Sequence, residues 1–185
     1  MNSNLLSTLL PQSNSQTTIK IVLVALGVLL LAISSKVQVP FWPVPMTLQS
    51  LVVLLIGATA GARVGGATLI SYLAAGSVGL PVFATGAGLA YMAGPTSGYL
   101  AGFLVAAVAV GYLADRGHGC TLLSALAIFA VGEVAIFALG TGWLATLVGG
   151  EKALAGGLVP FIPAEILKVA LATAILTLAW RQVKR

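Results

Sequence analysis

The sequence has very few charged residues. Of its 185 residues, 9 are Lys or Arg, 4 are Asp or Glu and 1 is His, and charged residues make up 7% of the chain. An ordinary soluble domain carries about 25%. So small a set cannot cover the surface of an 18.7 kDa globule, whereas a surface that faces lipid needs no charge. With 59% apolar residues, the chain is predicted to be an integral membrane protein.

The residues needed for several kinds of chemistry are also missing. The single cysteine, Cys120, excludes an intramolecular disulfide framework, and together with His118 it offers two metal ligands at most. No lysine follows a glycine, so the phosphate-binding loop of an ATPase is absent. The single aspartate, Asp115, excludes a two-aspartate protease centre, and His118 lies in a polar loop, unsuited to activate a buried serine. We therefore expect neither an enzyme nor a metal or cofactor site.

Apolar runs separated by charges and by Gly/Pro segments predict the membrane spans, each of which needs about 17 to 25 residues. A polar, uncharged leader and the lack of an Ala-x-Ala site favour a span over a cleaved signal peptide for the first run. The short second and third runs are joined only by Gly61-Ala62-Arg63, so one broken helix or a hairpin is the alternative there. The predicted fold is a single-domain, all-α bundle of six transmembrane helices, with a polar segment at 1–18 and spans near 19–35, 46–60, 64–79, 95–114, 121–147 and 161–181.

Lysine and arginine accumulate in the cytoplasmic loops of membrane proteins, and this rule tests the orientation. Six helices with both termini inside put six cations in the cytoplasm and two outside, and Lys168 within the sixth span completes the nine. We therefore expect cytoplasmic termini and a multi-pass protein of a bacterial inner membrane or an equivalent plasma membrane. The net charge of +5 then reflects topology and not nucleic-acid binding. The inner set is Lys20, Arg63, Arg116, Arg181, Lys184 and Arg185, and the outer set is Lys36 and Lys152.

Small residues recur at a spacing of four, which lets helix backbones approach closely. This pattern favours packing inside the bundle over an interface with a partner. The two stripes are Gly57, Gly61 and Gly65, and then Gly94, Gly98, Gly102 and Ala106.

Three ionisable residues lie at membrane depth, away from the basic ends of the spans, where a charge near the bilayer centre costs roughly 2.5 to 3.5 kcal/mol. Glu165 and Lys168 are three residues apart on one helical face and can pair with each other. We expect them to form a polar clamp for a small solute, with a helix-capping role as the alternative. Glu133, near mid-membrane, stays open between a proton site, a substrate contact and a neutral acid bonded to a neighbouring helix.

Two outer loops combine aromatic residues with residues that control the backbone. Three prolines stiffen the first loop, and glycines let the second approach closely. We expect the loops to cover an outward-facing cavity with aromatic walls, while an interfacial aromatic belt is an equal alternative for Trp42. The first loop carries Phe41 and Trp42, and the second carries Phe83, Thr85, Gly86, Gly88 and Tyr91.

Four segments of the chain resemble the signature segments of the BioY family, the biotin-binding S components of energy-coupling-factor transporters, and they occur in the same order. They are Val39–Gln49 (VPFWPVPMTLQ), Gly79–Ala84 (GLPVFA), Gly94–Phe103 (GPTSGYLAGF) and Pro160–Lys168 (PFIPAEILK). The likeness spans about residues 20 to 180. It implies a six-helix S-component bundle that binds biotin near its outer face, under the first and third loops.

The resemblance also implies that Glu165 and Lys168 contact biotin, although the family segment more usually has Gly-Asp where this chain has Ala164-Glu165. Biotin fits such a pair, because Glu165 can accept from a ureido N–H and Lys168 can donate to the ureido oxygen or the carboxylate. Both choices for Lys168 stay open. The candidate substrate-binding residues are Trp42, Gln49, Phe83, Thr85, Tyr91, Glu165 and Lys168, with Glu133 as a further candidate.

The family further implies partners, since this chain has no energy-converting motif of its own. A transmembrane coupling subunit and a pair of ABC-type ATPases would drive the inward delivery of biotin captured outside, with lipid around the bundle. The alternatives are an S component for another small vitamin, a free-standing proton-coupled carrier that uses Glu133, and a purely structural membrane subunit.

Overall fold

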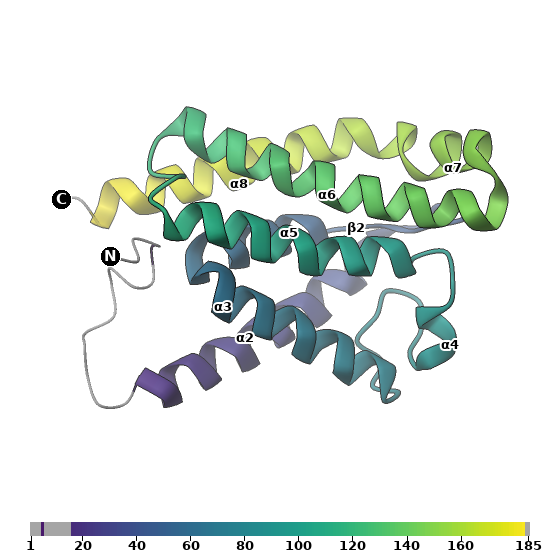
Figure 1. The fold of residues 1–185 in the computed structure, drawn as a ribbon, viewed down its shortest axis with the longest axis horizontal. Helices are drawn as coiled ribbons and strands as arrows, with labels where there is room; N and C mark the ends of the chain where they lie inside the picture. Colours follow the sequence, from purple (N-terminus) through teal and green to yellow (C-terminus); the bar gives the residue numbers. More distant parts are fainter. Residues whose placement is uncertain (1–4, 6–15, 184–185) are drawn as a thin grey trace.

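The protein is an all-helical bundle, seen in a computed structural model that describes Leu5 and residues 16–183 (Figure 1). Most of the expected polar segment 1–18, and the cations Lys184 and Arg185, lie outside these residues. Five helical stretches of the described chain are long and apolar enough to cross a membrane, as a multi-pass protein requires. The elements are α2 (Gln16–Lys36), β1 (Gln38–Val39), β2 (Met46–Thr47), α3 (Gln49–Ser77), α4 (Leu89–Met92), α5 (Ser97–Asp115), α6 (Leu122–Val148), α7 (Gly150–Gly157), the 3-10 turn η1 (Val159–Phe161) and α8 (Ile162–Val183).

Helix α3 reverses direction at Gly61, so the second and third predicted spans are two legs of one kinked element. Gly61 has φ 79° and ψ 174°, a conformation that glycine adopts readily. A Cβ built on Gly65 would lie 3.5 Å from Cα of Gly57. In a straight helix, residues eight apart are about 12 Å apart along the axis. Figure 1 shows the second leg returning toward α4.

The reversal is held by α5, which packs closely against both legs. A Cβ on Gly57 would meet the carbonyl oxygen of Ala107 at 2.7 Å, and one on Gly111 would meet the backbone nitrogen of Ala62 at 2.5 Å. The Asp115 carboxylate accepts from the amide of Ala62 at 3.1 Å, at the start of the second leg. The first small-residue stripe is therefore used for packing inside the bundle, as the sequence predicts.

The second stripe is used in the same way, between α5 and α6. Added Cβ atoms on Gly98 and Gly102 would come within 2.3 Å of Trp143 and 2.8 Å of Ile136, respectively. Ala106 is fully buried. Two glycine-lined contacts thus fix α5 between α3 and α6.

The first leg of α3 is short because an extended segment precedes it. Strands β1 and β2 form an antiparallel pair with Val39 opposite Met46, and α3 begins only at Gln49. The leg up to the kink at Gly61 is about 18 Å long, well short of a bilayer core of about 30 Å. The N-terminal turn of α3 therefore lies inside the bundle and not at its outer end.

The second outer loop, residues 78–88, is tied to α2 and α3 by hydrogen bonds to its carbonyl groups. Ser35 and Tyr72 donate to the carbonyl of Val82 at 2.8 and 2.9 Å, and Lys36 donates to that of Phe83 at 2.5 Å. Tyr72 also accepts from the side chain of Gln49 at 2.8 Å. This chain of bonds fixes the loop relative to the start of α3.

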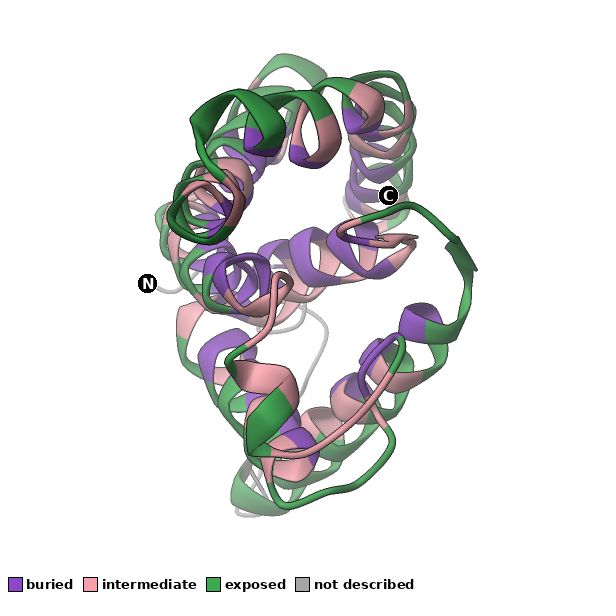
Figure 2. Ribbon diagram, turned by 90° about the vertical axis from the view of Figure 1, so that its right-hand side faces the viewer, coloured by how far each residue is buried: buried purple, intermediate pink, exposed green. Residues whose placement is uncertain are grey.

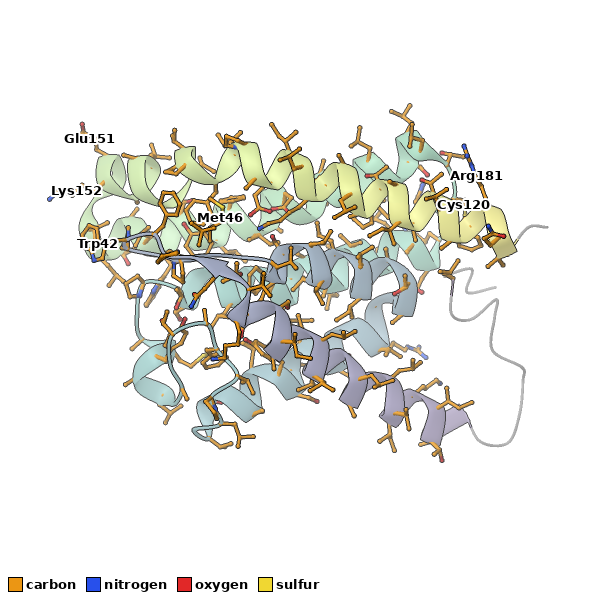
Figure 3. All side chains as sticks on the ribbon, turned by 180° about the vertical axis from the view of Figure 1, so that it is seen from behind. Trp42, Met46, Cys120, Glu151, Lys152 and Arg181 are labelled. Atoms are coloured by element: carbon orange, nitrogen blue, oxygen red, sulfur yellow. The ribbon has the colours of Figure 1, made fainter. Side chains whose placement is uncertain are left out.

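The two ends of the bundle differ in charge. Figure 3 places Arg181 and Cys120 at one end, and Trp42, Glu151 and Lys152 at the other. The described ends of the chain, the start of α2 and the end of α8, lie together at the Arg181 end (Figure 1). Viewed along the bundle, buried segments face the interior and exposed segments face outward (Figure 2).

Replacing Gly111 with alanine is expected to destabilise the bundle. The new methyl group would lie 2.5 to 2.7 Å from backbone atoms of Gly61 and Ala62, which cannot move without opening the turn of α3. Overpacking of this kind costs about 1 to 3 kcal/mol. Gly142→Ala is the matched control because nothing lies within 4 Å of its Cβ. Thermal unfolding of the detergent-purified variants measures the difference, and equal midpoints would contradict this packing.

Replacing Tyr72 with phenylalanine is expected to loosen the 78–88 loop. The change removes a buried hydroxyl that bonds both Gln49 and the carbonyl of Val82, and leaves these groups with fewer partners. Such a loss typically costs about 1 to 3 kcal/mol of unfolding free energy. Tyr112→Phe, at a half-exposed ring of α5, is the control. If the two variants unfold at the same temperature, the tether does not stabilise the fold.

Candidate functional site

A cavity opens above the N-terminus of α3 and extends between α5, α6 and α8. Its non-atom space, including the open mouth, is about 510 Å³. Apolar atoms dominate the lining, and a few polar groups converge on it. The lining residues are Val44, Pro45, Thr47, Gln49, Ser50, Ala84, Tyr91, Thr96, Tyr99, Leu100, Phe103, Ile136, Phe137, Phe161 and Glu165.

A buried polar network on one side of the cavity joins α3 to α8. Lys168 donates to Oε1 of Glu165 at 2.8 Å and to Oγ of Ser50 at 3.0 Å. Ser50 in turn donates to Oε2 of Glu165 at 2.8 Å, and the backbone carbonyl of Thr47 accepts from Lys168 at 2.5 Å. Each of the three ammonium hydrogens of Lys168 therefore has an acceptor.

The predicted pairing of Glu165 with Lys168 is thus present, and the pair does more than cap α8. Both side chains are about nine-tenths buried, and both reach across to α3. Glu165 lines the cavity, whereas Lys168 stands behind it. Each Glu165 oxygen accepts one bond and retains a lone pair, so the carboxylate can accept a further hydrogen bond from a molecule in the cavity.

Two groups of aromatic rings contribute to the walls. Phe161 packs against Tyr99 and Phe137, with ring centroids 6.5 and 6.1 Å apart, the first pair stacked and the second edge-to-face. Tyr91, which also lines the cavity, stacks on Phe83 at 4.9 Å. Aromatic faces of this kind can pack against the apolar ring of a ligand.

The structure brings together Gln49, Tyr91 and Glu165 among the predicted site residues, since all three line the cavity. Gln49 is buried and donates to Tyr72 and to the carbonyl of Leu31. Its side chain amide is therefore engaged on the α2–α3 side. Phe83 lies one layer behind, buried beneath Tyr91.

Trp42 and Thr85 are placed outside the cavity lining. Trp42 is 82% exposed at the tip of the first loop, on the outer end of the molecule (Figure 3). The loop packs instead against α7, where a Cβ on Gly156 would lie 3.0 Å from Pro43. Thr85 is exposed on the second loop. Their contact with a ligand stays a prediction, and so does that of Lys168.

Sequence reasoning missed three kinds of contributor. Ser50 completes the polar network, yet a lone serine carries no signal of its own. Tyr99 and Phe161 form part of the cavity wall, and both lie in segments that resemble the signature segments of the BioY family. Phe137 is indistinguishable in the sequence from any apolar residue that faces lipid.

Glu133 lies on α6 and is also buried, 8% exposed. Neither of its carboxyl oxygens has a hydrogen-bond partner among the described residues. Among those residues, moreover, no group of three or more His, Cys, Asp or Glu side chains is placed to hold a metal ion. The polar groups that line the cavity, among them Gln49 and Glu165, can recognise a solute by hydrogen bonds.

Comparison with known proteins assigns the family. The model of the BioY family matches residues 7–185. A probable biotin transporter BioY of Pyrococcus horikoshii is 37% identical over 155 residues, which cover 83% of this chain and 91% of the relative. The biotin transporter BioY of Rhizobium etli is 37% identical over 164 residues, 83% of this chain and 84% of the relative.

A solved structure has the same fold. It is the crystal structure at 2.1 Å of the S-component for biotin from an ECF-type ABC transporter, and it aligns with a TM-score of 0.80 at 24% identity over 95% of this chain and 96% of that one. This match confirms the predicted S-component architecture. Together with the family match, it confirms the resemblance found in the four sequence segments, and the chain belongs to the BioY family.

Proposed function

We propose that the protein takes up biotin, as the membrane subunit that captures the vitamin outside the cell. Membership of a family whose relatives are named biotin transporters or probable biotin transporters supports this function. The observation that carries it is the cavity itself, in which a buried carboxylate stands beside stacked aromatic walls. The protein is a transporter subunit and not an enzyme.

Biotin has three parts that match this cavity. Its ureido ring presents two N–H donors and one carbonyl acceptor, its thioether ring is apolar, and its tail ends in a carboxylate. The free lone pairs of Glu165 suit a ureido N–H. The rings of Tyr91, Tyr99 and Phe161 suit the apolar part, and Thr47, Gln49 and Ser50 supply further polar groups.

The roles of Glu165 and Lys168 differ in this proposal. Glu165 lines the cavity and accepts directly from the ligand, whereas Lys168 is engaged with Thr47, Ser50 and Glu165. Lys168 pairs with the carboxylate and fixes its orientation within an apolar bundle. To contact biotin itself, Lys168 must give up one of these three hydrogen bonds. The bond to the carbonyl oxygen of Thr47 is the best candidate, because that oxygen is chemically most similar to the ureido oxygen of biotin.

The start of α3 adds a favourable field. Its N-terminal turn lies inside the bundle, where the N-cap residue Leu48 makes no side-chain hydrogen bond and the hydroxyl of Thr47 accepts from the amide of Gln49 at 3.3 Å. The positive end of a helix favours an acceptor or anionic group nearby, as in carriers whose half-helices begin at the substrate. The ureido oxygen or the tail carboxylate of biotin meets this requirement.

The proposed orientation puts both termini in the cytoplasm. Among the described cations, Lys20, Arg63, Arg116 and Arg181 belong to the end where α2 begins and α8 ends, whereas Lys36 and Lys152 belong to the cavity end. The positive-inside rule then places the cavity on the outer face of a bacterial inner membrane or an equivalent membrane. Capture from outside follows from this placement.

Delivery inward is proposed to need an ATP-driven module of a transmembrane coupling subunit and two ABC-type ATPases. The chain has no phosphate-binding loop of its own. The fold it shares with the S-component of an ECF-type ABC transporter supports such partners. Docking to the coupling subunit would use the lipid-facing surface of the bundle.

Lys168→Met is expected to remove most biotin binding. The change leaves Glu165 buried without its counter-charge and costs about 1.5 to 3 kcal/mol, which is more than tenfold in Kd. Equilibrium binding of labelled biotin to purified protein measures it, with Lys152→Met, an exposed lysine of α7, as the control. Absence of saturable binding to the wild type would reject the biotin assignment, and a Kd for Lys168→Met within twofold of wild type would reject the role of Lys168.

A second variant keeps this test informative if Lys168→Met does not fold. Ser50→Ala removes one hydrogen bond to Glu165 and one acceptor of Lys168 while the ion pair remains. We expect a loss of roughly three- to tenfold in affinity. Unchanged affinity in Ser50→Ala would show that the network does not orient the carboxylate.

Biotin uptake by cells is expected to require the coupling module. In a host that lacks any coupling subunit and its ATPases, expression of this chain alone should give no uptake above background, and co-expression of the module should restore it. The measurement is accumulation of labelled biotin with and without an uncoupler. Uptake that persists without the module and collapses with the proton gradient would identify a free-standing proton-coupled carrier instead.

A further inference from the structure

Glu133 is a buried acid that the proposed binding network does not explain. It lies in the middle of α6, and its neighbour Gly132 packs against Leu54 of α3 and Val110 of α5. The side chain is 8% exposed, and neither carboxyl oxygen accepts a hydrogen bond from any described residue. A carboxylate buried without donors is strongly disfavoured.

The groups that Glu133 faces belong to α8. Ile136 and Phe137, three and four residues beyond Glu133 on α6, line the cavity together with Glu165. Residues at this spacing share one face of a helix, so Glu133 lies on the face of α6 that is directed toward the pair of Glu165 and Lys168. Lys168 has no spare hydrogen, because Thr47, Ser50 and Glu165 accept all three. Glu165 brings only acceptor oxygens. Two carboxyl groups therefore face each other beside one ammonium group.

Two hydroxyl groups on the other helices packed against α6 donate elsewhere. The Ser50 hydroxyl of α3 gives its hydrogen to Glu165. The Tyr99 phenol of α5 gives its hydrogen to the carbonyl of Gly157 at 2.8 Å. In α7 the ionisable residues Glu151 and Lys152 are exposed at the outer end (Figure 3). Thr173 of α8 has a buried hydroxyl without a partner among the described residues, but it lies eight residues beyond Glu165, about 12 Å along the helix. The donor between the two acids is therefore assigned to a hydrogen on one of them.

We infer that Glu133 is held as a neutral carboxylic acid that donates a hydrogen bond to Glu165, and that this shared proton positions the Glu165 carboxylate for ligand binding. The proton comes from water when the site forms. With it, the group of Glu133, Glu165 and Lys168 has zero net charge, and without it the group is singly negative. Glu133 is thus a positioning residue that acts through Glu165. This inference rests on the proposed function.

The sign of the pH dependence follows from the charge count. Biotin carries a carboxylate, so a negative group beside the cavity weakens its binding. Affinity is therefore full while the shared proton is bound, and falls as the pH rises and the proton leaves. Placing like charges together is costly, so the expected loss is on the order of tenfold or more in affinity.

Binding of labelled biotin to three purified variants tests the inference, from mildly acidic to mildly alkaline buffer, where the carboxylate of biotin stays ionised. Glu133→Gln keeps a donor to Glu165 without a titrating proton, so its affinity should match wild type in acid and stay constant as the pH rises. Glu133→Ala removes the donor and should bind more weakly throughout. Glu151→Gln, at an exposed acid of α7, should follow the wild-type profile.

A pH profile of Glu133→Gln that is parallel to that of wild type would overturn the inference. So would a loss in Glu133→Gln as large as that in Glu133→Ala, since the negative charge and not the proton would then be needed. If Glu133 served only for packing, its replacement would leave the pH dependence of biotin binding unchanged, and glutamine would not restore affinity relative to alanine.

Infrared spectroscopy of the ligand-free protein gives a reading that does not depend on biotin. At neutral pH the wild type should show the C=O stretch of a protonated carboxylic acid, and Glu133→Gln should lack it. If the wild type binds no biotin but shows this band, the proposed function fails and the shared proton stands. If biotin binds and the band is absent, the proposed function stands and the inference fails.

Discussion

The pairing of Lys168 with Glu165 is the interaction on which the site depends. An ammonium group inside an apolar bundle needs acceptors, and here Thr47 and Ser50 of the β2–α3 segment and Glu165 of α8 supply them. This requirement draws the start of α3 and the start of α8 together. The cavity lies where the two elements meet, so the bonds that satisfy a buried charge also set the position of the carboxylate that faces a ligand.

The cavity exists because α3 does not cross the bundle as a straight rod. Its reversal at Gly61 and its late start at Gln49 leave a short first leg whose N-terminus lies inside the protein. The glycines of α3 and α5 allow this turn because their backbones approach within distances that a methyl group would occupy. Small residues at one end of the molecule thus create the cavity at the other end. The second loop lies beside this cavity and is held in place by hydrogen bonds from Tyr72, Ser35 and Lys36.

Parts of the site could be predicted from the sequence for a physical reason. Charged residues are so rare in a lipid-facing chain that Glu165, Lys168 and Glu133 each required an explanation, and a spacing of three on a helix makes the first two neighbours. Ser50, Tyr99 and Phe137 could not be singled out in the same way, because serines and aromatic residues are common in membrane helices. For Trp42 the sequence favours a cover of the cavity and an interfacial aromatic belt equally, and in the structure its loop packs against α7 and leaves the indole exposed.

Composition and local spacing by themselves determined that the chain lies in a membrane, that it is helical, where its polar residues are and, through four short segments, which family it resembles. These properties depend on the cost of transferring side chains to lipid and on contacts between near neighbours along the helix, so they can be read locally. Only the tertiary structure decided that two predicted spans are legs of one reversed helix, which residues line the cavity and that Glu133 is buried without a hydrogen-bond partner among the described residues. Those facts depend on contacts between residues far apart in the chain, and apolar helices of similar composition can satisfy the membrane in many arrangements.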